Sequence, residues 1–82
     1  MVQPTVYEIT NRLNEIINNK ITREDVGRWA LEFIKNDDYI EIENIEAWHY
    51  LVIVSSIDEM ITPDEYLYSI KDIECWIQER NR

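Results

Sequence analysis

Turn-forming residues and cysteine are scarce in this chain of 82 residues, which has one glycine, two prolines and one cysteine. A fold with many strands is disfavoured, because its hairpins need turn residues that the chain does not have. A lone cysteine, Cys75, cannot form an internal disulfide, and we expect a small buried or half-buried thiol there. These absences favour a small helical fold that is stabilised by its apolar core alone.

Long apolar runs are also missing. The longest stretch without a polar side chain is residues 51–54, whereas a transmembrane helix needs roughly 20 residues. Residues 1–5 contain neither the basic region nor the apolar region of a signal peptide. The sequence therefore predicts a cytoplasmic protein with no membrane partner. It also predicts a single domain over residues 1–82, because a chain of this size buries only roughly 64% of its unfolded surface.

Basic residues are absent from residues 36–70, which hold nine acidic side chains. The net charge of −9 comes entirely from this segment, since the rest of the chain has eight acidic and eight basic residues. Such a charge argues against binding nucleic acid, which needs lysine and arginine for its phosphates. It favours an acidic surface that attracts a basic protein partner. The alternative interpretation is a solvated acidic face that only maintains solubility.

Residues suited to catalysis or metal binding are few. His49 is the single histidine, and with Cys75 it offers at most two ligands, too few for a structural zinc site. We expect a partly buried imidazole ring rather than a catalytic base. A glycine-rich phosphate loop is absent, and the acidic pairs at 58–59 and 64–65 lack the central glycine of a calcium loop. The sequence predicts no enzyme activity, no cofactor and no metal.

Four stretches have apolar residues at helical spacing: residues 5–19, 22–36, 45–55 and 69–79. Each begins at, or directly after, a residue whose side-chain oxygen can cap the first turn; the predicted N-caps are Thr5, Thr22, Asn44 and Ser69. Residues 50–54 are rich in β-forming side chains, so a strand competes with the helix there. The helical spacing that starts at Ile45 favours the helix.

Residues 62–65, with the sequence TPDE, predict a further helix start, because a hydroxyl cap precedes proline and two acids. Only three residues follow before Ser69 begins the next helix, so we expect one short helical turn. The predicted fold class is all-α, a bundle of four helices plus this turn, packed around Trp29, Trp48 and Trp76. Gly27 lies inside the second helix and predicts the close approach of a neighbouring helix.

A candidate interface combines the acidic segment with tyrosines, which can both pack and donate hydrogen bonds at protein interfaces. The predicted partner-binding residues are Asp37, Asp38, Glu41, Glu43, Tyr66 and Tyr68. The expected partner is a basic protein such as a nuclease toxin, whose cationic cleft the carboxylates would cover. The alternative is a structural or regulatory subunit that self-associates through the apolar side chains Ile53, Val54 and Ile57.

Two segments carry a resemblance to known proteins. The sequence TREDV at 22–26, followed by Trp29 and Ala30, is similar to an S/T-R-E-E-V-x-x-W-A pattern of small bacterial proteins. The sequence EYLY at 65–68, followed by DI at 72–73 and WI at 76–77, is similar to the E-Y-L-Y…D-I/F-x-x-W-I/L pattern at the C-terminal end of the same proteins. The resemblance spans residues 22–78 and implies membership of a family of small uncharacterised bacterial proteins. Some of these are similar to immunity proteins that accompany secreted toxins.

Overall fold

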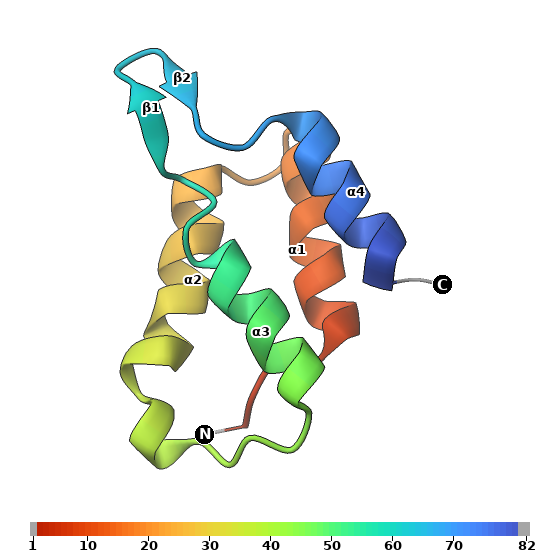
Figure 1. Ribbon diagram of the computed structural model, residues 1–82, viewed down its shortest axis with the longest axis vertical. Helices are drawn as coiled ribbons and strands as arrows, with labels where there is room; N and C mark the ends of the chain where they lie inside the picture. Colours follow the sequence, from red (N-terminus) through yellow and green to blue (C-terminus); the bar gives the residue numbers. More distant parts are fainter. Residues whose placement is uncertain (1, 81–82) are drawn as a thin grey trace.

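Figure 1 shows the computed structural model, which describes residues 2–80 of the chain. Within these residues the elements in chain order are α1 (Val6–Ile17), α2 (Arg23–Lys35), the 3-10 turn η1 (Asp37–Tyr39), α3 (Ile45–Val54), β1 (Met60–Thr62), β2 (Glu65–Tyr66) and α4 (Ile70–Arg80). Helix α3 packs against α1 and α2, and α4 packs against α1. The β1–β2 hairpin lies at one end of the long axis, and the connection from α2 to α3 lies at the other (Figure 1).

The predicted helix starts are confirmed at all four N-caps. Thr5 accepts a hydrogen bond from the backbone N–H of Glu8, whose carboxylate lies 3.5 Å from the N–H of Thr5 in a reciprocal capping box. The other three caps also accept from the N–H three residues later; they are Thr22, Asn44 and Ser69. Residues 50–54 are helical, as the spacing predicts. Each cap acts within one turn of its own residue, so local sequence determines it.

The all-α prediction is wrong, because residues 62–65 form the turn of an antiparallel hairpin and not the start of a helix. Strands β1 and β2 pair Met60 with Tyr66, and Leu67 donates its N–H to the carbonyl of Glu59. The hydroxyl of Thr62 accepts from the N–H of Asp64, two residues later, which is a turn bond and not a helix cap. Proline is equally suited to the second position of a turn. The protein is therefore α+β.

The core is centred on a tyrosine and aliphatic side chains, which corrects the prediction of a tryptophan-centred core. Tyr50 is fully buried, and its hydroxyl shares a 3.3 Å hydrogen bond with that of Thr10. Burial raises the pKa of the Tyr50 phenol. The fully buried aliphatic side chains around it include Ile9, Leu13, Val26, Leu51, Val54, Ile57 and Ile73. The three tryptophans are half-buried and cover the outside of this cluster.

The N-terminal segment fixes the connection between η1 and α3. The side-chain oxygen of buried Gln3 accepts from the N–H groups of Glu43 and Asn44, at 2.6 and 2.9 Å. Its amide nitrogen donates to the carbonyl of Asn44 at 3.0 Å. Ile40 in this connection is buried, whereas Ile42 is 41% exposed.

Two further expectations about burial are wrong. Cys75 is exposed on α4, and His49 is exposed on α3. Both residues fall on the outward faces of their helices, since the core-facing positions are taken by Ile73 and Tyr50. The sequence pattern predicts an apolar stripe on each helix, but it does not show how much of the helix surface is buried by neighbouring elements.

Candidate functional site

The predicted partner-binding residues do not form one surface. Asp37 and Asp38 lie in η1, and Glu41 and Glu43 lie in the connection that follows, all of them exposed. Tyr66 and the neighbouring Tyr68 lie at the opposite end of the molecule, in and after β2 (Figure 1). The alternative self-association face is also absent as a surface, because Val54 and Ile57 are fully buried.

Both tyrosines make contacts that hold the hairpin to the helices. Tyr66 donates a hydrogen bond from its hydroxyl to the carboxylate of Glu24 at 2.5 Å. The guanidinium of Arg23 lies over the Tyr66 ring, 4.3 Å from its centre. Tyr68 packs edge-to-face on Trp76, with ring centres 4.9 Å apart. These contacts assign the tyrosines a structural role in this part of the fold.

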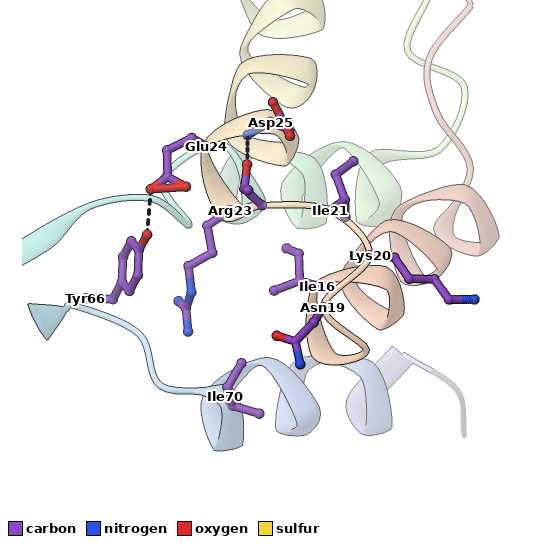
Figure 2. Close-up of a pocket in the computed structure, with 10 residues that line it drawn as sticks. Ile16, Asn19, Lys20, Ile21, Arg23, Glu24, Asp25, Tyr66 and Ile70 are labelled. Carbon is purple, nitrogen blue, oxygen red and sulfur yellow. Dashed lines mark hydrogen bonds between the residues drawn. The ribbon is translucent and has the colours of Figure 1, made fainter.

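A cavity of about 390 Å³ opens where the α1–α2 turn faces β2 and α4 (Figure 2). Buried Arg23 crosses it and donates to the carbonyl of Tyr68 at 2.6 Å and, more weakly, to that of Ile57 at 3.5 Å. The hydrogen bond from Tyr66 lowers the pKa of the Glu24 carboxyl, and the same bond raises the pKa of the Tyr66 phenol. Three polar side chains of this cavity, Arg23, Glu24 and Tyr66, are therefore engaged in contacts within the fold.

A second depression, of about 420 Å³, lies on the outer face of α2. Its lining residues recur at helical spacing and are Asp25, Arg28, Trp29, Glu32 and Phe33. Trp29 and Phe33 pack edge-to-face, with ring centres 5.6 Å apart and an interplanar angle of 76°. From α1, the guanidinium of Arg12 lies 4.5 Å from the centre of the Trp29 ring. We name these five residues together with Arg12 the α2 groove.

The cations of residues 2–80 divide into two groups. Buried Arg23 is engaged on backbone carbonyls, and half-buried Arg80 lies over the Tyr50 ring at 4.5 Å and pairs with Glu79 at 3.1 Å. The others are half-buried or exposed, and apart from Lys71 on α4 they lie on α1, α2 or the turn between them; they are Arg12, Lys20, Arg28, Lys35 and Lys71. The accessible positive charge is therefore concentrated on the α1–α2 hairpin.

Residues 2–80 contain no group of three or more histidine, cysteine, aspartate or glutamate side chains placed to hold a metal ion. In the same residues, no helix combines the length and the apolar character that crossing a membrane requires.

These observations define a small α+β protein whose accessible cations gather on one helical hairpin of an otherwise acidic surface. Residues 3–80 match the family described as "YxzC DNA-binding protein", and the chain belongs to this family. It is 31% identical over 77 residues to the uncharacterised protein YxzC of Bacillus subtilis (strain 168). That alignment covers 94% of this chain and 62% of the relative's length. No solved structure matches the chain.

The family corrects two expectations. Membership of a family of small bacterial proteins is confirmed, but its description as DNA-binding contradicts both an inhibitor of a basic protein and the exclusion of nucleic acid. Nothing supports a relation to immunity proteins. Net charge does not exclude nucleic acid, because it averages over the whole molecule, whereas a ligand contacts one face. Trp29 was assigned to the core because aromatic residues at helical spacing usually lie there.

Proposed function

We propose that this chain binds DNA. The observation that carries the proposal is the family match, which extends over residues 3–80 and so includes every helix and strand described above. Because the chain spans only 62% of the length of its B. subtilis relative, the proposal concerns this domain and not everything the longer protein does.

The α1–α2 hairpin is the surface that fits this function. Arg12, Lys20, Arg28 and Lys35 lie on it, whereas residues 36–70 supply nine acidic side chains and no base. Phosphates are attracted to lysine and arginine and repelled by carboxylates. The uneven charge would therefore orient DNA toward the hairpin and away from the rest of the molecule.

The proposal is tested by fluorescence anisotropy with labelled oligonucleotides, both duplex and single-stranded, at low salt. The double variant Arg28→Glu/Lys35→Glu is expected to weaken binding by about tenfold or more, since each reversed charge replaces an attraction with a repulsion. Lys71→Glu reverses one exposed cation on α4, outside the hairpin, and is the matched control for Arg28→Glu and Lys35→Glu made singly. It is expected to change the affinity by less than about twofold.

Absence of binding to both oligonucleotides at low salt would overturn the proposal. An equal loss in the hairpin variant and in Lys71→Glu would overturn the assignment to the α1–α2 face. Circular dichroism of each variant shows that the fold is retained, which is expected because the substituted side chains are exposed.

We propose that the role is binding without catalysis. The exposed His49 lines a depression of about 420 Å³ with Glu46, Glu79 and Arg80, on α3 and α4 and separate from the α1–α2 face. Oligonucleotides incubated with the protein and Mg²⁺ are expected to remain intact on a denaturing gel. Time-dependent cleavage that the purified protein alone supports would contradict this.

A further inference from the structure

The kind of DNA that this chain can bind is limited by its charge. A duplex presents its phosphates outward and hides the faces of its bases, so affinity for it depends on neutralising many phosphates. The α2 groove offers two guanidinium groups, Arg12 and Arg28, and it also contains the carboxylates of Asp25 and Glu32. Phosphate contacts alone therefore provide little affinity at this surface.

Helix α2 is also unsuited to reading a duplex from its N-terminus. A helix-turn-helix protein inserts the N-terminal residues of its second helix into the major groove. In this chain the first turn of α2 contains buried Arg23, which is occupied by backbone carbonyls, followed by the acids Glu24 and Asp25. Carboxylates at this position would lie next to the phosphates of both groove walls and repel them.

The α2 groove has the groups that bind unpaired bases. Its floor is formed by two aromatic side chains, Trp29 and Phe33, both half-buried and in edge-to-face contact. Two guanidinium groups flank this floor: Arg12 lies over the Trp29 ring, and Arg28 is exposed at the rim. Aromatic side chains combined with neighbouring cations are the features by which proteins bind single strands, because every base has a stacking face.

We propose that the α2 groove binds unpaired bases of single-stranded DNA by stacking on Phe33 and on the Arg12 guanidinium that covers Trp29, with Arg28 contacting an adjoining phosphate. This inference rests on the proposed DNA-binding function and specifies its ligand. Arg28 is held only weakly by Asp25: the Nη1–Oδ1 distance is 3.7 Å, and the two side chains are 76% and 51% exposed. A phosphate can displace such a carboxylate.

The test compares a single-stranded oligonucleotide with its duplex at equal length and salt concentration, by fluorescence anisotropy. The single strand is expected to bind at least about tenfold more tightly than the duplex. With one phosphate contact, its affinity falls with a logarithmic salt slope of about −0.7, or about two- to threefold between roughly 50 and 200 mM salt.

Four variants locate the site. Phe33→Leu keeps apolar volume but removes the aromatic face, and it is expected to weaken single-strand binding about fivefold or more. Tyr7→Leu is its matched control, because Tyr7 is a 75% exposed aromatic residue outside the groove. Arg28→Gln is expected to weaken binding, whereas Asp25→Asn is expected to strengthen it about two- to fivefold by releasing Arg28. Urea denaturation of each variant separates loss of binding from loss of folding.

The outcomes separate the two proposals. Binding of neither oligonucleotide overturns the proposed function and this inference together. Duplex binding that equals or exceeds single-strand binding, with a steep salt slope and no effect of Phe33→Leu, leaves the DNA-binding function standing and overturns the stacking site. An equal effect of Tyr7→Leu and Phe33→Leu also overturns it.

Discussion

Gly27 shows how one residue permits a contact between distant parts of the chain. A β-carbon built at this position lies 2.9 Å from Oδ1 and 3.1 Å from Cγ of Asp58, which belongs to the turn after α3. Glycine inside a helix costs about 1 kcal/mol relative to alanine, and here it lets that turn approach α2. A close contact does occur at Gly27, but the predicted neighbouring helix is wrong, because the neighbour is a side chain from a turn.

Substitution of Gly27 is predicted to depend on Asp58. In Gly27→Ala, the gain in helix propensity of about 1 kcal/mol is offset by displacing the Asp58 carboxylate from its rotamer, which costs about 0.5–1.5 kcal/mol. The free energy of unfolding should therefore change by less than about 1 kcal/mol. In an Asp58→Ala background the same substitution should stabilise the protein by about 1 kcal/mol, measured by urea denaturation. Equal effects in both backgrounds would show that the two residues do not interact.

The Tyr66–Glu24 hydrogen bond predicts a pH dependence with two limits. The lowered pKa of Glu24 means that its contribution to stability is present above its ordinary value of 4.5 and is lost as pH falls through the folded-state pKa. The raised pKa of Tyr66 means that the contribution is present below 10.0 and is lost as pH rises through the folded-state pKa. The bond therefore stabilises the fold between these two limits.

Tyr66→Phe removes this bond while keeping the ring under Arg23. The variant should be less stable than the parent protein near neutral pH, and the difference should vanish in acid below the Glu24 pKa. An NMR titration of the Glu24 carboxyl should give a pKa closer to 4.5 in the variant. If Glu24 titrates identically in both proteins, the hydrogen bond does not form in solution.

At the scale of elements, the β1–β2 hairpin is attached to the helices mainly through Arg23 at the start of α2. Its guanidinium reaches the carbonyls of Ile57, before the hairpin, and of Tyr68, after it, and it lies over the ring of Tyr66 within the hairpin. Most hairpin residues are exposed; Met60 and Ile61, for example, are 47% and 60% accessible. A two-stranded hairpin with so little burial needs such an attachment to be stable.

Arg23→Lys is predicted to loosen this attachment. Lysine keeps the charge but loses the planar group that bridges two carbonyls and stacks on Tyr66. Loss of charge-assisted hydrogen bonds of this kind costs about 1.5–3 kcal/mol of unfolding free energy. Arg28→Lys is the control on the same helix, and it should cost less than about 0.5 kcal/mol because Arg28 is exposed. Hydrogen exchange should be faster at Leu67 in Arg23→Lys alone.

At the scale of the whole molecule, the charge is divided between a balanced part and an acidic part. The α1–α2 hairpin has positive and negative side chains close together, whereas residues 36–70 have nine carboxylates without a neighbouring base in sequence. Repulsion among these carboxylates destabilises the folded state, and salt screens it.

The free energy of unfolding is therefore predicted to rise with salt concentration. The affinity for DNA, in contrast, is expected to fall as salt is added. Asp37→Asn/Asp38→Asn removes two exposed charges from the acidic part and should stabilise the protein at low salt, with a smaller salt dependence. Glu15→Gln/Glu32→Gln makes the same change in the balanced part and should have the smaller effect. A stability that falls with added salt would contradict the prediction.

Much of the helical structure follows from the sequence alone, because its causes act over three or four residues. The caps at Thr5, Thr22, Asn44 and Ser69 each bond to the N–H three residues later, and Asn19 takes the positive φ of 58° that ends the first helical segment. The hairpin could not be predicted in this way, because residues 62–65 suit a helix start and a turn equally well. Pairing between β1 and β2, together with the attachment at Arg23, decides between them.

The sequence by itself determined four helices, their starts and the concentration of acid in the middle of the chain. Tertiary structure decided which aromatic residue occupies the core, which cations remain accessible and which acids share a surface. Tyr50 is buried because three helices meet around it. The guanidinium of Arg23 donates hydrogen bonds to backbone carbonyls more than thirty residues away in sequence. Such contacts join segments that are far apart in sequence, and local sequence patterns do not predict them. The α2 groove could therefore be recognised only in the folded structure.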